Sequence, residues 1–552
     1  MRIYLSQTNP VIGDLEYNFS LIKREYLLAL DSGCDLVAFS ELNLTGYPPE
    51  DLLQKKYFID EVSQKIVQIC ELSKGKKCAL AVGVPLYDEG NLFNCVVVIE
   101  DGRIIQKFFK KTLPNYGVFD EKRYFKSAES FESFDFRGFK LVFPICEDIW
   151  SDENVAQIKE INPDLIISLN ASPFSQKKYQ KRIKVASNFA KKAGAPLIYI
   201  NQVGGVDSVI FDGRSFVLNE KGDLVLAMKG FCEDSGFIDF VKSDDKKVEV
   251  SADFSVRDVV FESLESDIYN TILLGLRDYV KKTGFSKVVI GMSGGIDSAI
   301  VATIAVDAFG SENVRLIALP SRYNSQASLD DALTCAKNLG VELEVIEIEN
   351  AFNTILSSLS EKFSGKNPDL TEENMQSRIR GIMLMAISNK FGNLVISTGN
   401  KSEMAVGYAT IYGDMCGAYN PIKDVYKTEV FAISKWRNKN IPEISVYKKI
   451  DLIPNSIIEK PPTAELRYDQ KDSDSLPEYD ILDKILYKII EEEKSIKEVI
   501  EETGFDEKLV KKIAKLFYLS EYKRKQAVIG AKVSKMSFDK DRRYLISNKF
   551  WA

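Results

Sequence analysis

The 552-residue sequence contains no histidine. Ser-His-Asp and Cys-His catalysis, and zinc or haem sites with histidine ligands, are therefore excluded within this chain. Acid–base chemistry has to come from carboxylates, lysines, tyrosines or cysteines. The eight cysteines form no Cys-x-x-Cys pair. In a large chain of this kind, free thiols are the natural interpretation.

Long apolar runs are also missing. The longest, such as residues 95–99, fall far short of the ~18 residues that a membrane-spanning helix requires. Residues 1–10 contain no apolar segment typical of a signal peptide, so we expect a cytoplasmic location and no membrane contact. The 73 basic and 80 acidic residues leave a net charge of -7, which provides no general attraction to nucleic acid.

Apolar, strand-like runs alternate with amphipathic segments over the first 240 or so residues. One pair of runs, at 96–99 and 103–109, predicts a hairpin around Asp101-Gly102. This pattern favours sheets covered by helices. A polar, aperiodic stretch follows, so we divide the chain into residues 1–245, a linker over 246–262, and residues 263–552.

A regular alternation of strands and helices fills the next part of the chain. Connections of this length between apolar strands predict a parallel, doubly wound sheet. Residues 451–480 are polar and rich in proline and predict a loop, and a highly charged helical region follows. The predicted strands are 287–291, 314–319, 343–347 and 394–397, and the helices between them are 297–309, 326–339 and 375–391.

The segment Ser293–Ser298 (Ser-Gly-Gly-Ile-Asp-Ser) joins the first of these strands to a helix. Its glycines let backbone N–H groups approach a phosphate, and the helix N-terminus adds positive potential. It lacks the Gly-Lys-Ser/Thr ending of a Walker A loop, which argues against transfer of a γ-phosphate. The string resembles the pyrophosphate loop of the N-type ATP pyrophosphatases, which cleave ATP between the α and β phosphates.

Four later strings, at 372–380, 397–403, 407–414 and 424–427, resemble the NAD⁺ synthetase family from about residue 262 onward. The resemblance implies a Rossmann-like domain, ATP as co-substrate and Mg²⁺ held by Asp297 and Glu403. It also implies which residues contact the substrates. These are Ser293, Gly295, Asp297, Ser298, Thr398, Lys427 and Thr463 for ATP, and Asn374, Arg378 and Asp414 for deamido-NAD⁺.

Three reactive side chains of the first half stand at strand ends: Glu41, Lys110 and Cys146. Backbone N–H groups and a nearby cation at Cys146 are expected to favour the thiolate. Because histidine is absent, a carboxylate is the expected base. The other seven cysteines are interpreted as small buried hydrophobic residues.

Strings around these three residues resemble the nitrilase superfamily, in the version found in the glutaminase domain of glutamine-dependent NAD⁺ synthetases. The match covers about 1–245 and implies an αββα sandwich with Cys146, Glu41 and Lys110 as the catalytic residues. Alignment on Leu113-Pro-Asn selects Lys110 rather than Lys111, and Thr112 stands where the family often has histidine. The implied glutamine-binding residues are Tyr47, Tyr116, Phe119, Glu121, Ser172 and Lys178.

Taken together, the resemblances imply that glutamine supplies ammonia, through an enclosed passage, to an ATP-dependent step that amidates deamido-NAD⁺ through an adenylate. They also imply a homo-oligomer with paired synthetase domains, small-molecule substrates, and no nucleic-acid partner.

Other readings are weaker. A glutaminase with an N-terminal cysteine would need cysteine where Arg2 stands, and a triad glutaminase would need histidine. A scaffold of degenerate enzyme domains would have lost Cys146, Asp297 or Glu403, and all three are present. Residues 495–512 resemble a DNA-binding helix-turn-helix, but 491–512 carry eight acidic and five basic residues. A packing or oligomer-contact helix pair fits that charge better.

Overall fold

A computed structural model describes residues 1–242, 248–251, 262–468, 470 and 476–550. The chain forms two compact units, Met1–Phe261 and Glu262–Ala552, which are described separately. A helix long and apolar enough to cross a bilayer is not found in the described ranges.

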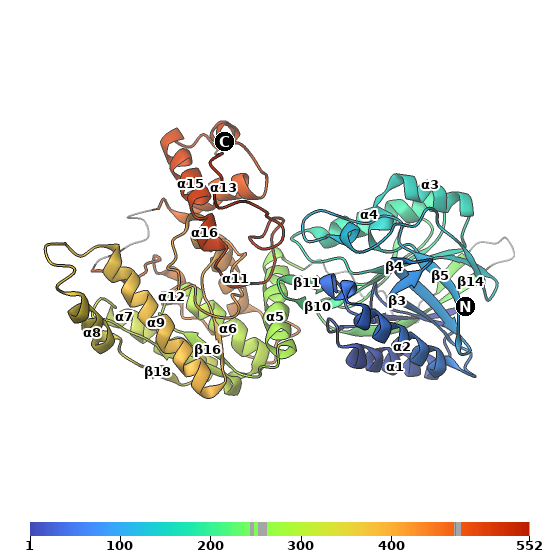
Figure 1. Cartoon of the computed structure of the whole chain (residues 1–552), viewed down its shortest axis with the longest axis horizontal. Coiled ribbons are helices and arrows are strands. Elements are labelled where there is room, and N and C mark those ends of the chain that lie inside the picture. Colours follow the sequence, from blue (N-terminus) through green and yellow to red (C-terminus); the bar gives the residue numbers. More distant parts are fainter. Residues whose placement is uncertain (243–247, 252–261, 469, 471–475, 551–552) are drawn as a thin grey trace. The chain divides into compact units, whose positions relative to one another are not determined.

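The first unit has four layers: two helices, two sheets and two further helices (Figure 1). Helices α1 (Leu15–Asp31) and α2 (Lys56–Ser73) cover the first sheet, and α3 (Asp152–Ile161) and α4 (Lys178–Ala193) cover the second. The first sheet has the order β15-β14-β1-β2-β3-β4-β5 and the second β13-β12-β9-β8-β7-β6. This arrangement confirms the predicted αββα sandwich.

The strands of the first sheet are β1 (Arg2–Gln7), β2 (Leu36–Ala38), β3 (Ala79–Asp88), β4 (Asn91–Glu100), β5 (Arg103–Phe109), β14 (Asp234–Lys242) and β15 (Val248–Ser251). Those of the second are β6 (Phe134–Phe136), β7 (Phe139–Val142), β8 (Leu165–Asn170), β9 (Leu197–Asn201), β12 (Phe216–Leu218) and β13 (Leu224–Ala227). A separate hairpin pairs β10 (Val203–Val206) with β11 (Val209–Asp212), and three short 3₁₀ helices are η1 (Glu50–Gln54), η2 (Glu121–Arg123) and η3 (Cys146–Trp150).

Successive side chains of a strand point to opposite faces of its sheet. Because helices cover one face and the other sheet covers the second, both faces carry apolar side chains. In β1, Ile3 and Leu5 enter the core between the two sheets, whereas Tyr4 packs beneath the helices. The predicted linker over 246–262 differs from the structure at its start. Residues 248–251 form β15, which extends the first sheet by pairing antiparallel with β14, and residues 252–261 lie outside the described ranges.

The second unit is built on a parallel sheet with the order β18-β17-β16-β19. The chain starts at β16 (Val288–Gly291), moves outward to β17 (Val314–Ala318) and β18 (Leu343–Val345), then returns to β19 (Leu394–Ile396) on the other side of β16. This reversal confirms the doubly wound prediction. It also creates a crevice beyond the carboxyl ends of β16 and β19, where such folds bind ligands.

The helices of this unit are α5 (Leu264–Lys282), α6 (Ile296–Phe309), α7 (Gln326–Leu339), α8 (Glu349–Leu359), α9 (Leu370–Phe391), α10 (Lys401–Val406), α11 (Lys427–Lys439), α12 (Asn455–Glu459), α13 (Tyr479–Ile490), α14 (Ile496–Thr503), α15 (Glu507–Leu519) and α16 (Glu521–Arg524), with one 3₁₀ turn, η4 (Ser311–Asn313).

Two elements differ from the sequence prediction. Helix α9 begins at Leu370 rather than near 375, because Asp369 caps it and exchanges hydrogen bonds with Glu372. That polar first turn carries no apolar periodicity. Within the predicted loop over 451–480, residues 455–459 form α12, and residues 469 and 471–475 lie outside the described ranges.

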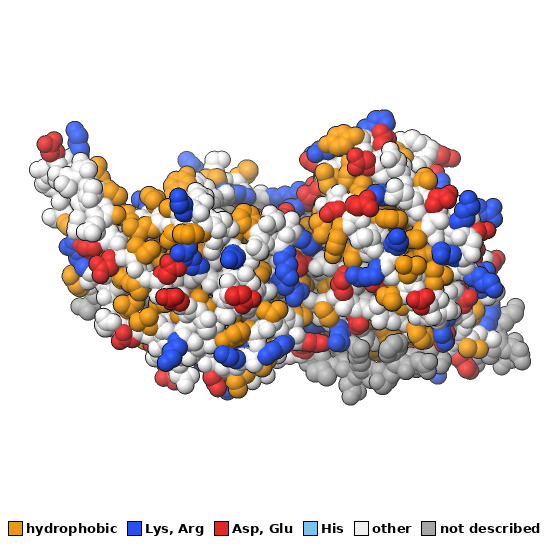
Figure 2. Space-filling model, turned by 90° about the horizontal axis from the view of Figure 1, so that it is seen from below, with side chains coloured by type: hydrophobic (Ala, Val, Ile, Leu, Met, Phe, Trp, Pro, Cys, Tyr) orange, Lys and Arg blue, Asp and Glu red, His pale blue; other side chains and the backbone are white. Residues whose placement is uncertain are grey.

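Helices α13, α14 and α15 share an apolar core that includes Leu486, Val499 and Phe517. The helix pair α14–α15 therefore uses its apolar faces for packing, and Lys488 and Lys494 both pair with Glu502 at its surface. Acidic and basic side chains are interspersed over the face shown in Figure 2.

Candidate active sites

A buried carboxylate–ammonium cluster lies in the first unit, where β2 and β5 end. Lys110 Nζ is 2.7 Å from Glu41 Oε1 and 2.7 Å from Glu121 Oε1. Asn94 Nδ2 donates to Glu41 Oε1 at 2.7 Å, and the backbone N–H of Ala171 donates to Glu41 Oε2 at 2.9 Å. Burial alone would lower the pKa of Lys110, but Glu121 and Glu41 raise that pKa well above its ordinary value. The lysine is therefore a fixed cation.

Cys146 is buried at the first position of η3, with φ of +48°. A non-glycine residue rarely adopts this left-handed conformation, and such strain is commonly found at functional sites. Burial and the charge of Glu41 raise the pKa of the Cys146 thiol well above its usual value, although Lys110 lowers it. The expectation that the surroundings favour a resting thiolate is therefore wrong. The effect of desolvation on the thiol outweighs that of Lys110, and the neutral thiol needs a base to become a nucleophile.

Asp148, which the sequence analysis did not identify, links the turn that carries Cys146 to the residues that follow Lys110. Its Oδ2 accepts from the backbone N–H of Ile145 at 2.9 Å, and its Oδ1 accepts from that of Thr112 at 2.6 Å. Burial raises the pKa of Asp148 from 3.8 to about 6, despite these N–H donors. The sequence feature that could have identified Asp148 is the Cys-Glu-Asp order that follows an apolar strand.

The six residues assigned to glutamine lie mostly around Phe119. The ring of Phe119 is 6.5 Å from that of Tyr47 and 5.5 Å from that of Tyr116, and Lys178 Nζ lies 5.8 Å from its centroid. The Tyr47 hydroxyl donates to Glu121 Oε1 at 2.7 Å. Burial raises the pKa of Glu121 to about 7.

Glu121 therefore contacts the lysine of the cluster as well as a residue of the aromatic group. Ser172 follows Ala171, whose N–H contacts Glu41, and its own N–H donates to Asn201 Oδ1 at 2.8 Å. The structure thus brings all six residues to the edge of the cluster that holds Cys146.

In the second unit, a cavity of about 310 Å³ lies at the carboxyl ends of the parallel strands. Most of the predicted ligand-binding residues line it. They are Ser293, Gly295, Asp297, Ser298, Thr398, Glu403, Asp414, Lys427 and Thr463. The position of this cavity agrees with the crevice expected from the strand order.

The loop after β16 lines this cavity and is bonded within itself. The hydroxyls of Ser293 and Ser298 are 3.2 Å apart, and the N–H of Gly295 donates to Ser293 Oγ at 3.2 Å. Gly294 has φ of +80°, and a Cβ there would lie 2.0 Å from the carbonyl oxygen of Ser328. Only glycine allows the loop this close approach to α7.

Lys427, at the N-terminus of α11, lies between the two carboxylates assigned to Mg²⁺. Its ammonium forms an ion pair with Asp297 and lies 3.5 Å from Glu403 Oε1. Among the described residues, no group of three or more acidic or cysteine side chains could hold a metal ion.

Asn374 and Arg378 are not among the residues that line this cavity, and Arg378 is exposed. Asn374 Oδ1 accepts from the Thr410 hydroxyl at 2.8 Å, and Arg378 Nε donates to the carbonyl of Ile411 at 3.2 Å. Both contacts hold the segment that leads to Asp414.

Sequence reasoning missed several lining residues. Glu465 Oε1 accepts from the hydroxyls of Ser328 at 2.7 Å and Ser325 at 2.9 Å. Burial lowers the pKa of Arg380 to about 10. Arg380 lies in one of the quoted strings, but Glu465 follows a proline-rich stretch that carries no periodic signal.

Each of the two units matches a known protein family. The family model described as carbon-nitrogen hydrolase matches residues 2–234, and the model described as NAD synthase matches residues 268–527. A solved structure from Cytophaga hutchinsonii, 20% identical, has a TM-score of 0.82 over all of this chain and 98% of that one, which supports the fold.

Relatives that match over their full length share one name, glutamine-dependent NAD(+) synthetase. The glutamine-dependent NAD(+) synthetase of Acinetobacter baylyi is 41% identical over 99% of this chain and 98% of its own, and that of Thermotoga maritima is 40% identical over 100% and 99%. The structure of the Acinetobacter baumannii enzyme in complex with ADP is 39% identical, with a TM-score of 0.77 over 100% of this chain and 99% of that one. The chain therefore belongs to the glutamine-dependent NAD⁺ synthetase family.

Proposed function

We propose that this chain forms NAD⁺ from deamido-NAD⁺, ATP and glutamine. The observation that supports this best is the presence, in one chain, of a buried cluster around Glu41, Lys110 and Cys146 and a cavity behind a pyrophosphate loop. The first arrangement suits amide hydrolysis, and the second suits cleavage of ATP between its α and β phosphates.

In the first unit, Cys146 attacks the carboxamide carbon of glutamine while Glu41 takes the thiol proton and passes it to the departing ammonia. Lys110 stabilises the oxyanion together with a backbone N–H, a contribution on the order of 3 kcal/mol for each donor. Water activated by Glu41 then hydrolyses the thioester. The aromatic residues around Phe119, together with Glu121, Ser172 and Lys178, hold glutamine.

In the second unit, the nicotinate carboxylate of deamido-NAD⁺ attacks the α-phosphate of ATP and expels pyrophosphate, and ammonia then displaces AMP. The N–H groups of the loop Ser293–Ser298 bind the phosphates, and Lys427 neutralises their charge. Thr398 and Thr463 complete the ATP site, and Asn374, Arg378 and Asp414 contact deamido-NAD⁺. The ADP complex of the relative from Acinetobacter baumannii supports a nucleotide site here.

Asp297 and Glu403 would hold Mg²⁺, which supplies further charge neutralisation at the phosphates. Ammonia is largely protonated near pH 7, so an enclosed passage for it belongs to the proposal. So do a cytoplasmic location and a homo-oligomer formed through the synthetase unit.

The experiment that tests this function measures NAD⁺ formation from deamido-NAD⁺, ATP and Mg²⁺, with glutamine or with ammonium as nitrogen donor. The wild-type chain should use both donors. Cys146→Ala should abolish the glutamine-dependent reaction and keep the ammonium-driven one, because only glutamine hydrolysis needs the thiol. Cys95→Ala, at another buried cysteine of the same unit, is the matched control and should retain both reactions.

A folded Cys146→Ala chain that loses both reactions would contradict this division of labour. A wild-type chain that is inactive with either donor would contradict the function itself and would direct attention to another acid substrate.

A further inference from the structure

Lys401 is a fully buried lysine at the start of α10, two residues before Glu403. Its Nζ contacts Asp424 Oδ1 at 2.8 Å and Ser534 Oγ at 2.6 Å, and it forms an ion pair with Glu491. A lysine ammonium paired with two carboxylates therefore lies inside the second unit.

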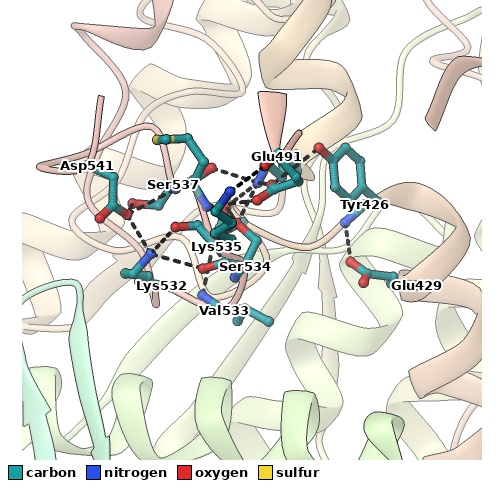
Figure 3. Close-up of polar contacts among 12 residues, drawn as sticks. Tyr426, Glu429, Glu491, Lys532, Val533, Ser534, Lys535, Ser537 and Asp541 are labelled. Carbon is teal, nitrogen blue, oxygen red and sulfur yellow. Dashed lines mark hydrogen bonds and ion pairs between the residues drawn. The ribbon is translucent and has the colours of Figure 1, made fainter. Parts of the chain in front are cut away.

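The residues 532–541, here called the C-terminal strap, complete this cluster. The backbone N–H groups of Val533 and Ser534 both donate to Asp424 Oδ2 at 2.8 Å, and that of Met536 donates to Glu491 Oε2 at 2.8 Å. Figure 3 shows the strap curving around Glu491, with Tyr426 on the other side of that carboxylate. Each buried charge is thus matched by an opposite charge and by hydrogen bonds.

The cluster joins the two elements that carry Glu403 and Lys427. The N–H of Lys401 donates to the carbonyl of Val425 at 2.9 Å, and the N–H of Lys427 donates to Ser402 Oγ at 2.9 Å. The start of α10 is therefore bonded to the segment that begins α11 at Lys401 and at the residue after it. Lys401 itself does not belong to the cavity lining.

Such a network contributes little net stability, because burying its charges costs about as much as their attraction returns. What a fully bonded network does provide is rigidity. We propose that Lys401 is a positioning residue for the ligase reaction: its buried ammonium, bonded to the strap, holds Glu403 and Lys427 in register at the cavity. This proposal rests on the ligase function proposed above.

The test compares ammonium-driven amidation, glutamine hydrolysis and thermal unfolding in full-length variants. Lys401→Met keeps an unbranched side chain, shorter by one atom, and removes its charge. We expect kcat for amidation to fall about ten- to a hundredfold, as for supporting residues around other phosphate and metal sites, with KM for deamido-NAD⁺ and glutamine hydrolysis within about twofold. If Lys401 only stabilised the fold, the variant would contain a smaller fraction of active enzyme. The kcat of the folded enzyme for amidation would then not fall separately from glutamine hydrolysis.

Lys532→Met is the matched control. Lys532 is also buried, but it bonds the carbonyls of Ser534 and Lys535 and the carboxylate of Asp541, all within the strap. Its loss should lower the unfolding midpoint while kcat stays within about threefold of wild type. Glu491→Gln added to Lys401→Met balances the buried charge and should recover the midpoint without recovering kcat.

Three results would overturn the proposal: a Lys401→Met kcat within about threefold of wild type, an equal loss in Lys532→Met, or recovery of kcat in the double variant. If Lys401→Met does not fold, Ser534→Ala replaces it. That change removes one hydroxyl from Lys401 and no charge, and kcat should fall about fivefold. An unchanged kcat would overturn the proposal. An inactive wild-type chain would instead overturn the proposed function, and this proposal with it.

Discussion

At Cys146, burial and charge act against each other. Desolvation and the negative charge of Glu41 favour the neutral thiol, whereas Lys110 favours the thiolate. Because the neutral form wins, the sulfur is held unreactive until a proton acceptor takes its proton. Glu41, the acceptor in the proposed mechanism, is held in place by hydrogen bonds from Asn94 and Ala171.

A prediction at the residue scale concerns Asp148. Its pKa is raised by burial from 3.8 to about 6, so its contribution to stability is fully present below pH 4 and is lost as pH rises through about 6. In Asp148→Asn this loss should be absent. The difference in free energy of unfolding between wild type and variant should therefore fall by about 3 kcal/mol over this range.

This comparison is best made by urea unfolding of a chain with Trp436→Phe and Trp551→Phe, in which Trp150 reports on η3. A difference that stays constant between pH 4 and 7 would contradict the raised pKa of Asp148.

A second residue-scale prediction concerns Asp297, which contacts Lys427 and accepts from Asn400 Nδ2 at 3.1 Å. Asp297→Asn keeps the shape of the side chain but removes its charge. NAD⁺ formation should be lost with both glutamine and ammonium, while glutamine hydrolysis continues. If either synthesis survives at saturating Mg²⁺, Asp297 is not the ligand we propose.

At the scale of elements, the proposed ATP site depends on the backbone of the loop between β16 and α6. Gly294→Ala would place a methyl group 2.0 Å from the carbonyl oxygen of Ser328, so the loop has to move away from α7. We expect kcat/KM for ATP to fall at least about tenfold, the effect of roughly 1.4 kcal/mol. Glutamine hydrolysis should be unchanged.

Gly284→Ala provides the control for that prediction. Gly284 has φ of +85°, close to that of Gly294, but nothing lies within 4 Å of its added Cβ. It reproduces the backbone strain without the collision. Equal losses of activity in the two variants would show that strain, rather than the approach to α7, is what matters.

At the scale of the whole molecule, apolar side chains on α9 remain exposed: Ile382 by 64%, Met385 by 37% and Phe391 by 58%. Exposed apolar patches commonly mark association surfaces. Light scattering should give a mass at least twice the chain mass of 62.2 kDa. Ile382→Asp should reduce it, whereas Val67→Asp, on the exposed face of α2, should not. A monomeric wild type would contradict the oligomer.

Much of the fold could be predicted from local pattern. The run of apolar residues before Ser293 and the glycines after it identified β16, its loop and α6, since strand, turn and helix signals are contained in neighbouring residues. The hairpin at Asp101-Gly102 was found for the same reason, and both residues have positive φ. The start of α9 was not found, because its first turn is polar. The strand at 248–251 was not found either, because its alternation of Val248 and Val250 with polar residues covers only four residues beside a highly charged stretch.

In the candidate sites too, the sequence identified some features and the fold determined others. Strand-end positions and family resemblance selected Glu41, Lys110 and Cys146, and the absence of histidine favoured a carboxylate as the base. Only the folded chain decided the charge state of Cys146, the bonds of Asp148 and the burial of Lys401 with the C-terminal strap. Burial and contacts between distant residues set those properties, and a pKa depends on every charge nearby in space, which linear spacing does not encode.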